Sequence, residues 1–199
     1  EASDDPQAIE YFTGRLRRES QRLSALVRDI IELSRLQSAD VIARGTLVST
    51  DALVNEALDR NRLAAEAKSI VLQAQVHYSG ELYADPELLG TALHNLVENA
   101  VRYSPEKTRV DLLVEREGDT LNISVTDQGA GIPEEEQARI FERFYRVDAA
   151  RSRQTGGTGL GLSIVKHVMG QHGGQVSVQS VPGQGSPFTL SLPIADTAV

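Results

Sequence analysis

The stretch Asp127-Gln128-Gly129-Ala130-Gly131-Ile132-Pro133 decides the fold of this chain. It follows Leu121–Thr126, whose alternating apolar residues predict a half-buried strand that runs into a turn. A carboxylate at a strand end, followed by two glycines one residue apart, can accept hydrogen bonds from a flat ligand while the bare backbone lies against it. More often, such a stretch is only a corner in which the aspartate bonds its own loop. The neighbouring motifs decide between these alternatives.

A second motif carries polar residues on one face of an expected helix. Asn95 and Asn99 are four residues apart and lie on the same helix face, joined by Arg102. Tyr103 lies close to this face. An amide oxygen is a neutral ligand that suits Mg²⁺, an ion that keeps several waters and shares the phosphates of a nucleotide. Two asparagines on a helix are, by themselves, more often solvent-exposed. Glu98 lies off this face, and we expect it to be a surface charge.

A third motif is the glycine-rich run Gly157-Thr158-Gly159-Leu160-Gly161-Leu162. We expect it to open a helix, so its free N–H groups and the helix dipole can hold a polyphosphate. It is not a Walker loop, which needs Gly-Lys-Ser/Thr, and the dinucleotide fingerprint needs glycine at the position of Leu162. A flexible linker is the alternative, but the run passes directly into an apolar helical pattern.

The fourth motif, Phe141–Arg146, precedes a polar stretch without periodicity at Ala149–Gly156. That stretch suits a mobile lid that orders over a bound nucleotide. Phe141 and Phe144 would anchor its hinge, although aromatic residues at helical spacing are more often core residues.

These four motifs, in this order and at this spacing, resemble the catalytic ATP-binding domain of bacterial sensor histidine kinases, in the family that also holds gyrase, Hsp90 and MutL. The resemblance covers roughly residues 5–195, and the sequence resembles the actinobacterial phosphate-sensing subgroup. It implies a Bergerat-type fold. It also implies transfer of the γ-phosphoryl group of ATP to a histidine of the full protein, and then to an aspartate of a response-regulator receiver domain.

The resemblance also implies roles for single residues. Asn99 is the implied Mg²⁺ ligand, Arg102 meets the phosphates, and Tyr103 lies near the nucleoside. Asp127 accepts from the exocyclic amine of adenine, which guanine replaces by a carbonyl. Arg146 lies near the γ-phosphate, where it could neutralise developing charge, so Arg102 and Arg146 are the catalytic candidates. The expected nucleotide-binding set is Asn95, Asn99, Arg102, Tyr103, Asp127, Gly129, Gly131, Ile132, Arg146, Gly157, Thr158, Gly159, Leu160, Gly161, Leu162 and Thr189, the last of these placed beside Asp127.

Two absences narrow the mechanism that the resemblance implies. ATP-hydrolysing relatives carry a glutamate that activates water at the position of Asn95, and asparagine cannot act as that base, so we expect little hydrolysis. Histidine kinases carry their phosphoacceptor in a His-Glu/Asp motif on the first bundle helix. None of His77, His94, His167 and His172 has that context. We therefore expect this chain to bind ATP and Mg²⁺ without autophosphorylating.

Two other functions stay open at this point. One is an ATPase of the gyrase, Hsp90 and MutL kind, which phosphate release at single-site turnover would reveal. The other is a non-catalytic nucleotide-binding or dimerisation module, which the complete set of motifs disfavours.

Composition excludes several classes of protein. The 199 residues are 40% hydrophobic and can bury a sizeable core, while a net charge of −8 without a basic run argues against nucleic-acid binding. The chain has no cysteine, and no apolar run approaches the ~18 residues of a membrane span. Met169 is its only methionine, so we expect a fragment of a longer protein. We expect the fragment to be cytoplasmic and the full protein to be anchored in the cell membrane.

Apolar residues from Ile9 to Leu36 follow a seven-residue repeat, which predicts a bundle helix. The arginines of this segment lie off the apolar stripe. An ordinary amphipathic helix that packs on its own domain is the alternative. Since the phosphoacceptor is missing, we interpret the segment as the second helix of a dimerisation domain, through which the full protein would form a homodimer.

The remaining pattern predicts an α/β fold, a two-layer sandwich with a mixed sheet and helices on one face. Expected strands cover 46–50, 70–76, 81–84, 108–114, 120–127, 175–181 and 186–192, and expected helices cover 50–68, 86–104, 134–141 and 159–172. Thr50 or Asp51 is expected to cap the first of these helices, whose inward residues include Leu63. The expected domains are 1–40, part of a helical dimerisation domain; 41–45, a linker; 46–195, the catalytic ATP-binding domain; and 196–199, a tail.

Overall fold

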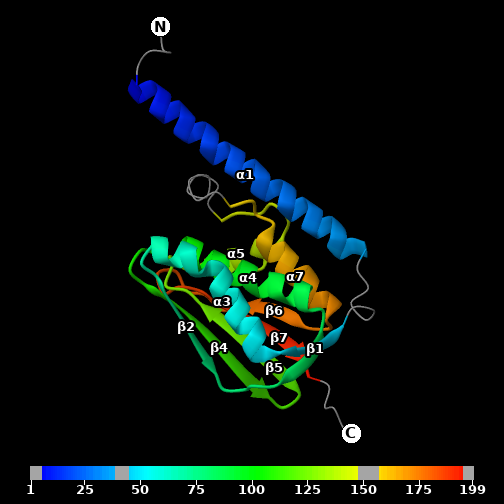
Figure 1. Ribbon diagram of the computed structural model, residues 1–199. Coiled ribbons are helices and arrows are strands. Elements are labelled where there is room, and N and C mark those ends of the chain that lie inside the picture. The colour runs from blue at the N-terminus through cyan, green and yellow to red at the C-terminus, as the bar shows by residue number, and fades with distance from the viewer. Residues whose placement is uncertain (1–5, 39–44, 148–156, 195–199) are drawn as a thin grey trace.

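The computed structural model describes residues 6–38, 45–147 and 157–194, which form a long helix and an α/β domain (Figure 1). The linker expected at 41–45, except Gly45, and the lid expected at 149–156 lie outside the described residues. The elements in chain order are α1 (Pro6–Ser38), β1 (Thr46–Ser49), α3 (Thr50–Ala67), β2 (Val71–Val76), β3 (Glu81–Ala84), α4 (Pro86–Tyr103), β4 (Arg109–Glu117), β5 (Thr120–Thr126), α5 (Glu134–Gln137), the 3₁₀ helix η1 (Arg139–Phe141), α7 (Gly161–Gln171), β6 (Gln175–Val178) and β7 (Pro187–Pro193).

The domain is built on a five-stranded sheet in the order β2-β4-β5-β7-β6, beside a small antiparallel pair of β1 and β3. In the large sheet β2 pairs in parallel with β4, and the other neighbours are antiparallel. The helices α3, α4 and α7 cover one face of this sheet (Figure 1). On β5 the apolar residues Leu121, Ile123 and Val125 are buried in alternation. The mixed-sheet, two-layer α/β architecture predicted from the sequence is therefore confirmed.

The helix α4 begins and ends at residues that explain its bounds. The side chain of Asp85 accepts hydrogen bonds from the backbone N–H groups of Glu87 and Leu88, and Pro86 occupies the first helical position. The helix ends at Tyr103, with Ser104 as the C-cap before Pro105. Its inward face buries Leu89, Leu93, Leu96, Val97 and Ala100. Burial of this apolar face fixes the direction in which the opposite, polar face points.

The structure corrects the prediction for the start and the inward face of α3. Ser49 is the N-cap, because its side chain accepts from the backbone N–H of Ala52. The Thr50 hydroxyl is used elsewhere, since its one proton is shared between the carbonyl oxygens of Tyr78 and Gly80, each 3.2 Å away. Leu63, expected inward, is 80% exposed.

Other helices and strands differ from the expected bounds in smaller ways. The expected helix at 134–141 is divided into α5 and η1. The last helix begins at Gly161 rather than Gly159, since Gly159 has φ of 77° and lies outside the helical region. The strand expected to extend to Val181 ends at Val178.

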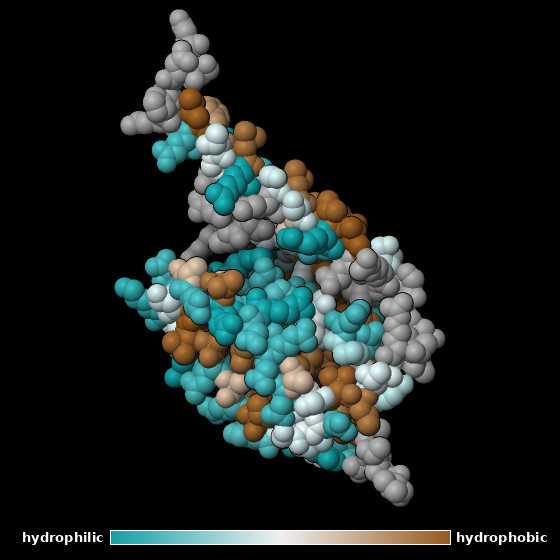
Figure 2. Space-filling view, in the orientation of Figure 1, coloured by the Kyte–Doolittle hydropathy of each residue, from teal (hydrophilic) through white to brown (hydrophobic). Residues whose placement is uncertain are grey.

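The long helix α1 lies across the helical layer and contacts α7 (Figure 1). Many of its large apolar side chains are exposed, and Figure 2 shows apolar atoms along its outer edge, away from the domain. These side chains are Ile9, Tyr11, Phe12, Leu16, Leu23, Val27, Ile30 and Ile31. None of the helices within 6–38, 45–147 and 157–194 combines the length and the apolar character that a membrane crossing requires.

Candidate functional site

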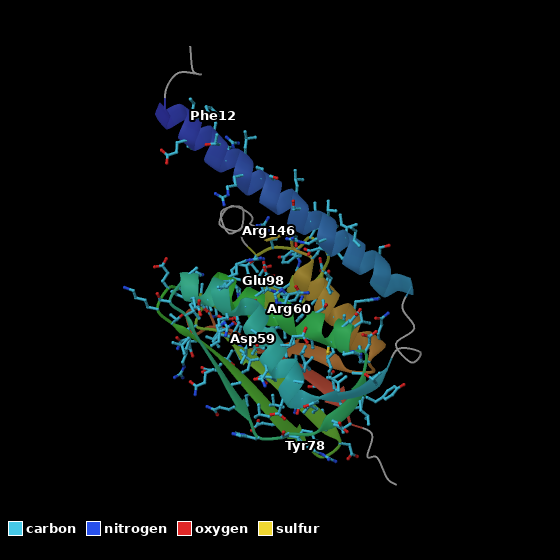
Figure 3. All side chains as sticks on the ribbon, viewed as in Figure 1. Phe12, Asp59, Arg60, Tyr78, Glu98 and Arg146 are labelled. Carbon is cyan, nitrogen blue, oxygen red and sulfur yellow. The ribbon has the colours of Figure 1, made fainter. Side chains whose placement is uncertain are left out.

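A cavity of about 1200 Å³ opens between the helical layer, the loop after β5 and α1. Its walls come from α4, from the loop Asp127–Ile132, from Arg146 and from the glycine-rich run that leads into α7. Figure 3 shows Arg146, Glu98 and Arg60 in the region between α1 and α3, and all three line this cavity. The four sequence motifs therefore meet at one place.

The polar face of α4 forms one wall. Asn95, Asn99 and Arg102 all line the cavity. Within the described residues, the Asn95 Nδ2 atom is buried without a hydrogen-bond partner. Glu98, expected to be a surface charge, also lines the cavity, and its Oε1 lies 2.5 Å from a terminal guanidinium nitrogen of Arg102. The Glu98 side chain is still 40% exposed, as a surface charge would be, but its pairing with Arg102 at i+4 places it at the cavity, which was not expected.

Asp127 lies at the end of β5 and is 6% exposed. Its Oδ1 accepts a hydrogen bond from the backbone N–H of Gly129 at 2.7 Å, and its own backbone N–H donates to the carbonyl oxygen of Ser186 at 3.4 Å. Burial raises the pKa of the Asp127 carboxyl above its ordinary value, and the backbone hydrogen bonds at Gly129 and Ser186 partly oppose this shift. The site thus holds a buried carboxylate acceptor, and within the described residues no cationic side chain contributes to the shift of its pKa.

The two glycines of this loop, Gly129 and Gly131, are required because neighbouring backbone leaves no room for a side chain. A Cβ atom at Gly129 would lie 2.9 Å from the Tyr103 carbonyl oxygen. At Gly131, which has φ of 71°, a Cβ atom would lie 2.2 Å from the Val181 carbonyl oxygen. The sequence suggested that these glycines make room for a ligand, whereas the structure shows that they make room for neighbouring backbone.

The glycine-rich run brings the start of α7 to the polar face of α4. A Cβ atom at Gly157 would lie 3.3 Å from an Arg102 guanidinium nitrogen, and one at Gly161 would lie 3.5 Å from Asn95 Oδ1. The N-cap residue of α7, Leu160, is apolar and makes no side-chain capping hydrogen bond. The first-turn N–H groups of the helix and its dipole are therefore directed toward the α4 face, as an anion site requires.

A carboxylate of α1 reaches the same run. Thr158 Oγ1 donates to Asp29 Oδ2 at 2.5 Å and accepts from the backbone N–H of Leu160 at 3.2 Å. Burial is the largest cause that raises the pKa of Asp29, and the hydrogen bond from Thr158 opposes it. An acidic side chain thus lies beside a loop whose geometry suits phosphate.

The hinge residues proposed from the sequence behave differently from one another. Phe141 packs edge-on against Phe188, with 6.4 Å between ring centroids. Phe144 is 59% exposed and has φ of 64°, which is uncommon for a residue other than glycine. Its backbone N–H donates to the Gly159 carbonyl oxygen at 2.8 Å. This bond ties together the two chain segments that flank residues 148–156.

Two members of the expected set do not line the cavity. Leu160 is fully buried in the core. Thr189 pairs with Ser124 in the sheet, and their hydroxyl oxygens lie 2.8 Å apart, so Thr189 is not beside Asp127. Ser186 takes that place. The other expected residues, Asn95, Asn99, Arg102, Tyr103, Asp127, Gly129, Gly131, Ile132, Arg146, Gly157, Thr158, Gly159, Gly161 and Leu162, all line the cavity.

Several cavity residues were not predicted. Besides Ser186 and Phe188 they include three cationic side chains, Arg28 of α1, Arg60 of α3 and Lys68 at the end of α3. The pairing of Thr126 with Pro187 brings Ser186 to Asp127, and only a known strand register could have revealed this. The lining thus places cationic side chains beside carboxylates, among them Asp29 and Glu98, in a chain of net charge −8.

Comparison with known proteins points to one family. The sequence pattern that defines the family of histidine kinase-, DNA gyrase B- and HSP90-like ATPases matches residues 84–196. The sensor-like histidine kinase SenX3 of Mycolicibacterium smegmatis is 45% identical over 192 residues, which are 96% of this chain and 50% of that protein. SenX3 of Mycobacterium tuberculosis H37Rv is also 45% identical, over 47% of its length. The chain therefore spans about half the length of these curated relatives.

Solved structures agree with this result. A structure of full-length ShkA in complex with AMPPNP has a TM-score of 0.77 at 29% identity, over 98% of this chain and 40% of that chain. The mycobacterial sensor histidine kinase MprB has a TM-score of 0.65 at 29% identity, over 75% of this chain and 97% of that chain. The buried carboxylate, the asparagine face and the glycine-rich helix start thus lie on a fold shared with these proteins. The chain belongs to the family of histidine kinase-, DNA gyrase B- and HSP90-like ATPases.

Proposed function

We propose that this chain is the ATP-binding catalytic part of a sensor histidine kinase, with residues 46–195 as the catalytic domain. The observation that carries the proposal is the meeting of Asp127, the Asn95–Arg102 face of α4 and the start of α7 around one cavity. The ShkA structure, which contains AMPPNP, supports an adenine nucleotide as the ligand. A hydrolase of the same family needs a general base at position 95, and asparagine there cannot supply it.

In this proposal each wall of the cavity has its own task. Asp127 accepts from the exocyclic amine of adenine, and because Asp127 is buried, water competes little for this bond. The N-terminus of α7 holds the phosphates through its first-turn N–H groups. Arg102 and Arg146 line the cavity and would neutralise charge on the transferred phosphoryl group. Binding and transfer are thus assigned to different elements.

The donor set also suits Mg²⁺. Asn99 offers a neutral amide oxygen as a ligand, whereas the buried, unpartnered Asn95 Nδ2 is a donor that suits a phosphate oxygen rather than the ion. Within the described residues, no three His, Cys, Asp or Glu side chains group together, so an ion held by Asn99 would take its other ligands from phosphate and water. The ion would supply charge neutralisation at the phosphates, and the chain would hold it through Asn99.

The full protein would then transfer the γ-phosphoryl group to a histidine outside this chain, and from there to an aspartate of a response regulator. The names of the relatives, which are sensor-like histidine kinases, support this step. This chain matches about half of their length, so the histidine would lie in the other half. We assign α1 to a helical dimerisation domain that forms a homodimer, because its outer apolar side chains are exposed. We further propose that the full protein is anchored in the cell membrane and that this part faces the cytoplasm.

Calorimetric titration with ATP and with GTP, each with and without Mg²⁺, tests the proposal, and phosphate release is followed in the same samples. We expect ATP to bind more tightly than GTP, binding to depend on Mg²⁺, and release to be negligible. Absence of ATP binding would refute the nucleotide site. Rapid phosphate release would instead favour an ATPase.

A further inference from the structure

Lys68 is a half-buried cation whose side chain donates three hydrogen bonds to the end of another helix. It is the C-terminal cap residue of α3. Its Nζ donates to the carbonyl oxygens of Val101, Arg102 and Ser104 at 2.8, 2.9 and 2.7 Å. An ammonium group has three N–H donors, so these bonds use its full capacity.

These bonds lie where α4 most needs them. The last carbonyl groups of a helix lack intrahelical partners, and a cation there also complements the helix dipole. The backbone of Lys68 belongs to the same junction, since its carbonyl oxygen accepts from the backbone N–H of Lys107 at 3.0 Å. Lys68 thus joins the turn after α3 to the chain at the end of α4 through both its side chain and its backbone. Burial lowers the pKa of Lys68, because desolvation disfavours the charged ammonium group.

The segment that Lys68 holds carries part of the proposed nucleotide site. Arg102 and Tyr103 both line the cavity. The Tyr103 carbonyl oxygen, which lies between those that Lys68 binds, lies against Gly129 of the Asp127 loop. Movement of this last turn would therefore displace both a phosphate-facing guanidinium and the backbone against which the adenine loop packs.

We propose that Lys68 is a positioning residue for nucleotide binding, which fixes the last turn of α4 so that Arg102 faces the phosphates. The inference rests on the proposed function and deepens it. Lys68 acts through Arg102 and need not touch the nucleotide, so its effect should depend on the presence of the Arg102 guanidinium.

A double-mutant cycle tests this dependence. Lys68→Met keeps an apolar stem but leaves three carbonyl groups without donors, and we expect ATP binding to weaken by about tenfold. In an Arg102→Ala background, the same substitution should have much less effect. Lys166→Met removes an exposed lysine of α7 and should leave ATP affinity unchanged. Lys68→Arg, which restores a cation with several donors, should recover part of the affinity.

Hydrogen exchange of the ligand-free protein supplies a readout that does not depend on ATP. We expect faster exchange in Lys68→Met at residues 101–104, with the sheet protected as in the wild type. The positioning role would be overturned if Lys68→Met lost the same ATP affinity with and without Arg102, or if exchange at 101–104 were unchanged. In that case ATP binding by the wild type would still uphold the proposed function. Wild-type protein that fails to bind ATP would overturn both.

Discussion

In the proposed function, Asp127 is the residue that selects the base. Asparagine at this position keeps an Oδ1 acceptor for the Gly129 N–H but presents an amide donor where adenine also donates. We expect Asp127→Asn to weaken ATP binding at least tenfold, since a hydrogen bond to a charged group contributes about 1.5–3 kcal/mol. Calorimetric titration of the variant measures this effect.

The same variant makes a separate prediction for stability. Burial raises the folded-state pKa of Asp127, so the folded protein holds this proton more tightly than the unfolded chain. The contribution of Asp127 to stability therefore decreases as pH rises from its ordinary pKa to the raised one, and it is unfavourable at neutral pH. Thermal melting without ligand should show Asp127→Asn at least as stable as the wild type at pH 7. A large drop in melting temperature would mean that Asp127 serves the fold rather than the ligand.

Asn99 carries the prediction about the metal ion. Loss of its amide oxygen removes a candidate Mg²⁺ ligand, so ATP binding by Asn99→Ala should be the same with and without Mg²⁺. Asn55→Ala, which removes an exposed asparagine of α3, is the matched control and should keep the wild-type response. Titrations in Mg²⁺ and in a chelator compare the two variants. A wild-type Mg²⁺ response in Asn99→Ala would exclude the ligand role.

Sequence reasoning located most of the cavity at the residue scale because its motifs are local. Asn95, Asn99 and Arg102 share a helix face by spacing alone, and Asp127 is marked by its place at a strand end. This reasoning failed for Thr189, which was predicted beside Asp127, whereas Ser186 lies there. Which residue in or just before β7 lies beside Asp127 depends on the register between β5 and β7, and a single sequence does not visibly encode that register.

At the scale of elements, the helix starts show how tertiary contacts change a local pattern. Ser49, Thr50 and Asp51 are all good N-cap residues by type. Thr50 is unavailable because its hydroxyl bonds the carbonyl groups of Tyr78 and Gly80, and Asp51 accepts from Ser79. In contrast, Asp85-Pro86 caps α4 as predicted, since both signals belong to the same few residues.

The contact between α1 and α7 leads to a prediction about nucleotide affinity. Asp29 places a carboxylate on Thr158, beside the expected phosphate position, and like charges oppose each other. We expect Asp29→Asn to tighten ATP binding severalfold at pH 7. Glu10→Gln removes an exposed carboxylate farther along α1 and should have no effect. Titration calorimetry of both variants measures the difference.

The pH dependence of this contact has a defined sign. Burial, the main cause, raises the pKa of Asp29, so protonation of the carboxyl begins at a higher pH than for an ordinary aspartate. The gain from Asp29→Asn should therefore shrink as pH falls through that pKa, because the wild-type charge is then lost. An equal gain at all pH values would show that charge is not the cause.

At the scale of the whole molecule, two kinds of surface are combined in one chain. The α/β domain encloses its apolar residues, whereas α1 leaves large apolar side chains exposed along its outer edge (Figure 2). Exposed apolar stripes of this kind mark sites of association. The heptad pattern predicted this stripe from the sequence, but the approach of Arg28 and Asp29 to the nucleotide cavity had no local signal.

The last prediction concerns self-association through α1. Leu16 is 70% exposed and belongs to the repeat of Ile9, Leu23 and Ile30. If this stripe pairs two copies of the chain, Leu16→Asp would bury an unpaired charge at the interface and should weaken dimerisation by at least about tenfold.

Ser24→Asp is the matched control for this variant, because it adds the same charge at an exposed position outside the repeat. Sedimentation over a range of protein concentrations compares both variants with the wild type. We expect Leu16→Asp to remain monomeric where the wild type and Ser24→Asp associate. Equal sedimentation of all three proteins would exclude α1 as the dimer interface. Because Leu16 lies outside the cavity, ATP affinity should be unchanged in Leu16→Asp, so the measurement separates assembly from nucleotide binding.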